Sequence, residues 1–276
     1  MLMPTTLQTD LSEPRTPLEH EIAELGPWFH NIHLPDGTQT APGHPLGDFP
    51  TYKWRVISPN LPEDMTGWTA LDIGCNAGFY SLQLAARGAD VTGIDINDHY
   101  LNQARWAAEQ FALGSRIQFL HKQVYELAFT EDSYDLILFM GVFYHLRHPL
   151  LALDIVSEKF EKLLVFQTLT MPGEQVFVFE DDLTIDDRLL LLHPAWPKMA
   201  FIEKSLAGDP TNWWAPNHAA VLAMLRSCGL RPLKNPGHEI YFCRRDEQCK
   251  TDVNREELSI AAKSVAQLNS PSMKTK

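Results

Sequence analysis

The central part of the chain alternates between short apolar segments and segments whose apolar residues recur at helical spacing. Apolar residues next to one another over most of 134–140 are typical of a strand buried on both faces. The apolar segments predict strands at 69–73, 89–94, 116–121, 134–140 and 162–168. The segments between them predict helices at 79–87, 100–113 and 150–160. This order predicts an α/β fold, a parallel sheet with helices on both faces.

The flanking segments lack this alternation. We expect residues 1–16 to form a flexible tail and residues 17–50 an N-terminal cap, with a helix at 17–25 followed by an ordered aromatic loop. We expect the main domain to cover 51–246. It includes an insertion without regular structure at 172–215, a helix that begins after Asn217 and a closing strand at 238–243. Residues 247–276 predict a polar tail with an amphipathic stretch at 256–268.

The composition is that of an ordinary globular protein, with 45% apolar and 21% charged residues in 276. The longest apolar run, 136–143, is far too short to span a membrane. Four cysteines without a CxxC pair, and a start without a basic and apolar leader, predict a reduced, cytoplasmic protein. The net charge of −12 argues against a large polyanion as partner.

A glycine turn follows the first predicted strand, in the sequence ALDIGCNAGF at 70–79. At the carboxyl edge of a parallel sheet, such a turn is where nucleotide-like ligands bind. A dinucleotide fingerprint needs glycine at the first, third and sixth positions, but counting from Gly74 the third is Asn76 and the sixth is Phe79. No Gly-Lys-Ser/Thr follows either. The turn therefore disfavours a nicotinamide dinucleotide and a phosphate loop.

An acidic residue, Asp95, ends the second predicted strand 21 residues after Gly74. A carboxylate there can accept two hydrogen bonds from a ribose diol. Together with the open glycine turn, it points to an adenosine without a diphosphate. Two alternatives stay open: Asp95 as a plain turn residue, and Asp72 as a residue that only fixes the turn.

The turn DIGCNAG with Asp95 resembles motif I and the acidic loop of class I S-adenosylmethionine-dependent methyltransferases. A narrower resemblance lies in YDLILFMGVFYHLRHP at 134–149, which is similar to a signature of the tRNA wobble-uridine carboxymethyltransferases. The segment around Lys53 resembles the lead-in to motif I in that family. The resemblance covers about residues 50–170 and implies a Rossmann-like sheet.

The resemblance also implies S-adenosyl-L-methionine as cofactor and a set of residues around it. The glycine turn would pass under the methionine part, Asp95 would take the ribose hydroxyls, and Lys53 would reach the cofactor's carboxyl end. Gln123 and Val124 would flank the adenine. The implied cofactor-binding residues are Lys53, Asp72, Gly74, Cys75, Asn76, Gly78, Asp95, Ile96, Gln123, Val124 and Met140. For Met140 a core position, and for Lys53 a surface position, stay open as alternatives.

The carboxymethyl members of that family use a cofactor with an extra carboxylate, which needs cationic compensation when buried. Residues 16–52 hold no lysine or arginine, the position of a further family tryptophan is taken by Asp48, and no clear C-terminal arginine counterpart exists. We therefore expect the unmodified cofactor and transfer of a methyl group. Arg147 stays open as a substitute cation.

Tyr144 and His145 follow the fourth strand and are the candidates for catalysis. His145 would act as a base or would only orient a loop. His30 and His33 would also face the site if the aromatic loop folds over it. We expect no metal, because no third ligand is evident.

We expect a small-molecule or glycan acceptor rather than tRNA, since acidic residues predominate in 172–198. The alternative, a tRNA wobble-uridine modifying enzyme, predicts one contiguous basic surface from Lys53, Arg55, Arg87, Lys122 and Arg147. A third reading is a degenerate fold retained as a partner-binding module. The sequence leaves the oligomeric state open.

Overall fold

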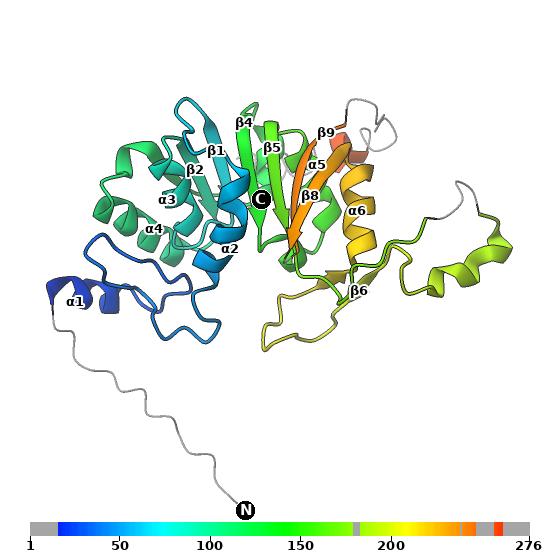
Figure 1. The fold of residues 1–276 in the computed structure, drawn as a ribbon, viewed down its shortest axis with the longest axis horizontal. Helices are drawn as coiled ribbons and strands as arrows, with labels where there is room; N and C mark the ends of the chain where they lie inside the picture. Colours follow the sequence, from blue (N-terminus) through cyan, green and yellow to red (C-terminus); the bar gives the residue numbers. More distant parts are fainter. Residues whose placement is uncertain (1–15, 179–182, 238, 247–256, 262–276) are drawn as a thin grey trace, which may run out of the picture.

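The computed structural model describes residues 16–178, 183–237, 239–246 and 257–261, and their centre is a seven-stranded sheet (Figure 1). The strand order is β3-β2-β1-β4-β5-β9-β8. The first five strands in this order are parallel, and β9 runs antiparallel to both of its neighbours. The strands are β1 Thr69–Ile73, β2 Asp90–Asp95, β3 Ile117–His121, β4 Tyr134–Met140, β5 Phe160–Gln167, β8 Leu230–Gly237 and β9 Ile240–Arg245.

Helices cover both faces of this sheet, because successive side chains of a strand point to opposite faces. In β4, Leu136 and Leu138 pack with α2, α3 and α4, whereas Ile137 and Phe139 pack with α5 and α6. The predicted α/β fold with two covered faces is therefore confirmed. The helices are α2 Phe49–Ile57, α3 Phe79–Ala86, α4 Asp98–Gln110, α5 Pro149–Ser157 and α6 His218–Ser227, and short 3₁₀ turns η1 Ser58–Asn60, η2 Gly114–Arg116, η3 Val124–Phe129 and η4 Phe143–His145 join them.

Strands β1 and β4 have the predicted boundaries, and the other predicted strands and helices are shifted by one to three residues. Helix α4 begins two residues early because the Asn97 side chain accepts a hydrogen bond from the His99 N–H and caps it. The sequence prediction missed α2 and β8. Residues 1–15, 247–256 and 262–276 lie outside the described part, so the amphipathic stretch at 256–268 is described only as a helix at 257–261.

The prediction of no regular structure between 172 and 215 is wrong in part. β6 Met199–Phe201 pairs with β7 Trp214–Pro216, and a 3₁₀ segment, η5, covers Ile185–Leu192. In Figure 1, η5 extends away from the sheet. The alternation that marks a strand cannot appear in strands of three residues, so the pattern of the sequence carried no signal for this hairpin.

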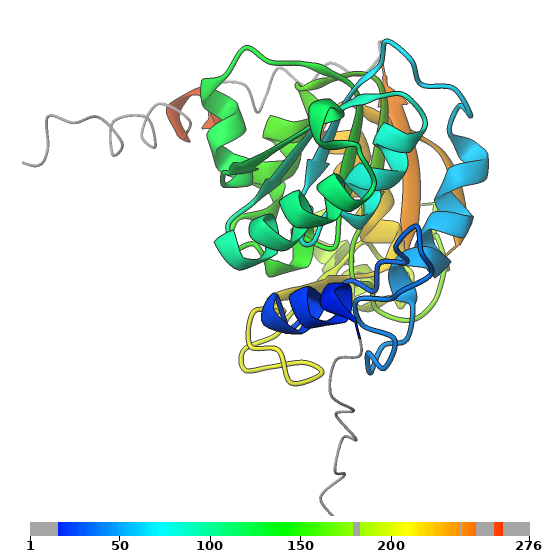
Figure 2. The same cartoon turned by 90° about the vertical axis from the view of Figure 1, so that its left-hand side faces the viewer.

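The N-terminal segment packs on the body of the domain through polar anchors. Helix α1 (Pro17–Glu24) has a capping box between Thr16 and Glu19. The Gln103 amide of α4 donates to the carbonyls of Leu25 and Pro27, 2.7 and 3.0 Å away. In Figures 1 and 2, α1 with the following loop and the segment that holds β6 and β7 lie beyond the same edge of the sheet. That edge is the carboxyl edge, where β1 and β4 end.

The helices of the described residues include none that is both long and apolar enough to cross a lipid bilayer.

Asn217 joins α6 to the β6–β7 hairpin. Its side chain accepts from the N–H groups of Ala220 and Lys198 and donates to the Trp196 carbonyl at 2.7 Å, all in a buried position. We expect Asn217→Ala to lower the free energy of unfolding by about 2 kcal/mol, because it removes a helix cap and leaves buried groups unpaired. Urea denaturation measures this. Ser227→Ala at the exposed end of the same helix is the control, and equal effects of the two substitutions would contradict the assignment.

Candidate active site

The glycine turn runs from β1 into α3 directly beneath the residues that follow β4. Gly74 has a φ of +69°, and a Cβ there would lie 2.3 Å from Cγ2 of Val142. The N–H groups of Gly74 and Cys75 donate to the Ile94 carbonyl at 2.8 and 3.0 Å. Any side chain at Gly74 would be strained and would clash, so glycine holds the turn close to both β2 and β4.

The carboxylate of Asp95 joins the turn to the end of β2. Its Oδ2 accepts from the Asn76 N–H and its Oδ1 from the Asn97 N–H, both at 2.9 Å. A carboxylate offers about four lone-pair sites, so each oxygen can accept one more hydrogen bond. The next residue, Ile96, is 56% exposed and offers an apolar face beside this carboxylate. The arrangement suits a ligand with a diol and a planar ring.

Asp72 lies behind the turn, buried among apolar neighbours. Its Oδ2 accepts from the Ser81 hydroxyl of α3 at 2.7 Å, which ties β1 to α3. Burial raises the pKa of Asp72 to about 6, against the effect of the hydrogen bond from Ser81. The contact fits the alternative in which Asp72 fixes the turn.

Lys53 on α2 reaches the carboxyl end of β5. Its Nζ donates to Oε1 of Gln167 at 3.2 Å, and Nε2 of Gln167 donates to Oε2 of Glu239 at 3.3 Å. Burial lowers the pKa of Lys53, and the carboxylate of Glu239 partly offsets this. Lys53 is therefore a partly buried lysine with a polar partner at this edge. No local pattern in the sequence points to Glu239, since only the pairing of β5 with β9 brings it here.

Tyr144 and His145 follow β4 and contact the insertion. The imidazole Nδ1 of His145 lies 2.9 Å from Oγ1 and 3.2 Å from the carbonyl oxygen of Thr211. The Thr211 hydroxyl donates to Asp209 at 2.6 Å. A carbonyl only accepts, so the contacts assign the proton to Nδ1 and leave Nε2 as the acceptor of the neutral ring. Burial lowers the pKa of His145, which keeps the ring neutral at pH 7.

The phenol of Tyr144 lies next to this imidazole, with ring centroids 4.2 Å apart. Burial, followed by the carboxylates of Glu239 and Asp209, raises the pKa of Tyr144 to about 12. Tyr144 is therefore a neutral hydrogen-bond donor at pH 7. The Trp213 N–H donates to its carbonyl at 2.9 Å, so the insertion is anchored at this point.

The remaining predicted residues also lie along this edge. Met140 is buried at the end of β4 and pairs in register with Gln167. Gln123 is exposed and Val124 is buried at the start of η3, directly after the Lys122 N–H that donates to the Asp95 carbonyl. Gly78 begins α3 with a φ of +82°, and burial raises the pKa of Cys75 well above its ordinary value. The fold thus brings together the residues that the sequence proposed for a cofactor.

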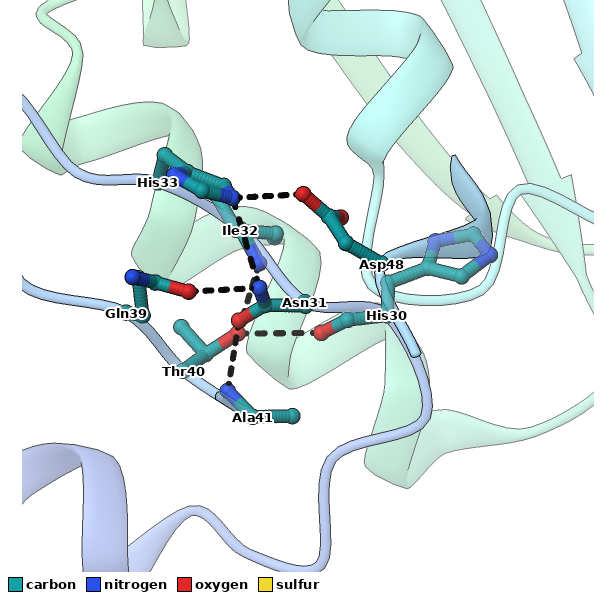
Figure 3. A network of polar contacts seen from close by, with 8 residues as sticks. All are labelled: His30, Asn31, Ile32, His33, Gln39, Thr40, Ala41 and Asp48. Carbon is teal, nitrogen blue, oxygen red and sulfur yellow. Dashed lines mark hydrogen bonds and ion pairs between the residues drawn. The ribbon is translucent and has the colours of Figure 1, made fainter. Parts of the chain in front are cut away.

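The aromatic loop contacts the start of α3 through His30. Figure 3 shows the polar network within the loop. His33 pairs with Asp48 at 2.7 Å, within a network that holds the loop closed on itself. The ring of His30 points away from that network, and its centroid lies 6.3 and 5.9 Å from those of Phe79 and Tyr80. Burial lowers the pKa of His30 to about 3, so the ring is neutral. His30 therefore contacts the start of α3, whereas His33 stabilises the loop through Asp48.

The five basic residues of the tRNA hypothesis do not form one surface. Lys53 is partly buried and donates to Gln167. Arg87 donates to the carbonyls of Ser58 and Pro62 at the opposite, amino edge of the sheet. The Arg147 guanidinium lies 4.4 Å from the ring centroid of Trp213 and 5.5 Å from that of Phe201.

Among the described residues, no three His, Cys, Asp or Glu side chains converge as a set of metal ligands.

The fold and this edge define the class of protein. A mostly parallel seven-stranded sheet with β9 antiparallel between β5 and β8, a glycine turn after β1 and an acid after β2 are the features of a class I S-adenosylmethionine-dependent methyltransferase. Residues 70–158 match the family described as "Methyltransferase domain".

Curated relatives share a part of the chain. The tRNA U34 carboxymethyltransferase of Pseudomonas syringae pv. tomato is 31% identical over 189 residues, which are 64% of this chain and 55% of that protein. The protein of that name from Hahella chejuensis is 28% identical over 204 residues, 73% of this chain and 55% of its own length. The chain thus spans about half the length of the curated relatives it matches.

Solved structures support the fold at low identity. The N-terminal domain of EvdMO1, in a crystal structure with S-adenosylhomocysteine and D-fucose, has a TM-score of 0.54 at 16% identity and covers 82% of this chain and 93% of that one. A putative S-adenosylmethionine-dependent methyltransferase from Listeria monocytogenes has a TM-score of 0.51 at 15% identity, with 71% and 99% covered.

The buried carboxyl of Asp72 gives the site a pH signature. Its pKa rises from an ordinary 3.8 to about 6 on folding, so protonated Asp72 favours the folded state, and this contribution is lost as the pH rises from 4 to 6. We expect Asp72→Asn to gain about 2–3 kcal/mol in stability relative to the wild type between pH 4 and pH 7. Urea denaturation of both proteins at several pH values measures this, and a difference that stays constant with pH would contradict it. Asp90→Asn, at an exposed position, is the control.

Proposed function

We propose that the protein binds S-adenosyl-L-methionine at the edge formed by the glycine turn and transfers its methyl group to an acceptor held by the insertion. The observation that carries this proposal is the position of Asp95, whose carboxylate is fixed by the turn and keeps lone pairs for a ribose diol. The family match and the fold support it.

The residues along this edge fit each part of the cofactor in turn. Asp95 would accept from both ribose hydroxyls, and Ile96 would lie against the adenine, which Gln123 and Val124 would flank. Lys53 would meet the methionine carboxylate, since it is a partly buried ammonium whose hydrogen-bond partner is the neutral Gln167 amide. Met140 would contribute an apolar surface beside the sulfonium.

Bound S-adenosylmethionine supplies a methyl group that is already electrophilic, so the protein has mainly to orient the acceptor and exclude water. The insertion contributes Trp213 next to Tyr144 and Thr211 next to His145. Tyr144 would donate a hydrogen bond to the acceptor. His145 would take the acceptor's proton at Nε2, since Nδ1 is engaged with Thr211.

We propose a small-molecule or glycan acceptor for this domain. Three of the predicted basic residues are separated or engaged elsewhere in the structure, and the net charge is −12. Exposed Phe201 next to Trp213 and Arg147 provides a surface on which a ring can stack.

A tRNA wobble uridine is the second candidate acceptor, favoured by the relatives that are named tRNA U34 carboxymethyltransferases. Transfer of a radiolabelled methyl group to bulk tRNA, beside transfer to a tRNA-free extract of small molecules, separates the two acceptors. Label in tRNA alone would overturn the small-molecule proposal.

Asp95 provides the test of the cofactor site. We expect Asp95→Asn to weaken S-adenosylmethionine binding by about 1.5–3 kcal/mol, because a charge-assisted hydrogen bond to the ribose is lost. Isothermal titration calorimetry measures this, with NAD as the competing ligand. Asp98→Asn, three residues on and exposed, makes the same change in charge and should bind like the wild type. If Asp95→Asn binds S-adenosylmethionine as the wild type does, or if the wild type binds only NAD, the proposal is contradicted.

His145 provides the test of the base. Because burial lowers its pKa, the wild-type rate should stay constant above pH 7 and fall only below the ordinary range of histidine. We expect His145→Ala to lower kcat by about 10²-fold or more and to abolish the acidic fall. His148→Ala, at an exposed position in the same segment, is the control. A variant that keeps the wild-type pH profile would assign His145 to loop orientation.

A further inference from the structure

Glu239 ends a line of side chains that starts at Lys53. The line passes from Nζ of Lys53 to the Gln167 amide, at 3.2 Å, and from there to Oε2 of Glu239, at 3.3 Å. Oε1 of Glu239 accepts from the N–H and the hydroxyl of Thr170, at 2.6 and 2.8 Å. Three hydrogen bonds thus fix a half-buried carboxylate directly before β9.

This line runs beside the place where the methyl group would be transferred. Gln167 pairs in register with Met140, and the Gly141 N–H donates to the Gln167 carbonyl at 3.3 Å. A Cβ on Gly141 would lie 4.0 Å from Oε1 of Gln167. The carboxylate of Glu239 is close enough to Tyr144 to contribute to the raised pKa of its phenol.

The charges of this region leave no cation for a second carboxylate. Lys53 would be matched by one carboxylate, that of the methionine end of the cofactor. The guanidinium of Arg147 lies over the rings of Trp213 and Phe201. An additional carboxylate on the transferred group would meet Glu239 in a partly desolvated site, where like charges repel strongly. A sulfonium with an uncharged methyl group meets an opposite charge there.

We propose that Glu239 determines which donor this site accepts: it selects a sulfonium donor whose transferred group is uncharged and rejects one whose transferred group carries a carboxylate. The inference rests on the proposed S-adenosylmethionine-dependent function and goes beyond it by naming a residue that sets the choice of donor.

The test compares two ligands on the whole chain. Dissociation constants for S-adenosylmethionine and for carboxy-S-adenosylmethionine are measured by isothermal titration calorimetry on the wild type, Glu239→Gln and Glu239→Ala. The wild type should bind the uncharged donor more tightly. In both variants, the ratio of the two constants should shift toward the carboxylated donor by about tenfold or more, since a like charge is removed.

Glu109→Gln on the exposed face of α4 makes the same change in net charge and should keep the wild-type ratio. A thermal melt identifies a variant that has lost its fold. If one of the two Glu239 variants is unfolded, the ratio is taken from the other. A wild type that prefers the carboxylated donor, or variants that keep the ratio, would overturn the role of Glu239 alone. A wild type that binds neither donor would overturn the proposed function as well.

Discussion

The cofactor side of the candidate site depends on the close approach of the glycine turn to the ends of β2 and β4. Gly74 allows it, because a side chain there would overlap Val142. Asp95 stabilises it, because its two oxygens accept backbone N–H groups on either side. The carboxylate that would bind a ribose is therefore also the one that keeps the turn in place. Because the turn is already rigid, it loses little conformational entropy when a ligand binds.

Two segments that are distant in sequence enclose this edge from opposite sides. The N-terminal loop buries His30 against Phe79 and Tyr80 at the start of α3. The insertion binds the backbone of Tyr144 through Trp213 and the ring of His145 through Thr211. The sheet thus provides fixed strand ends, and the enclosing segments provide the side chains that differ between proteins of one fold. Differences in acceptor among related chains are expected in these segments.

Two partly buried side chains of opposite charge lie on one side of the edge. Lys53 and Glu239 lie at the two ends of the Gln167 amide, and neither contacts the other directly. The amide therefore separates the two charges and keeps each available for a ligand. The carboxylate of the proposed cofactor would meet the cation of this pair, and its sulfonium would meet the anion.

The sequence determined the sheet core and the turn because their signals are local. The apolar runs predicted the exact bounds of β1 and β4. The glycine turn, together with Asp95 21 residues after Gly74, indicated the candidate cofactor edge. The tertiary structure alone decided the neighbours of these residues. The β6–β7 hairpin has no periodic pattern of its own. The partial burial of Lys53 depends on the packing of α2 against α3 and β8. Glu239 reaches the site only because β9 inserts antiparallel between β5 and β8, a long-range pairing that no local pattern encodes.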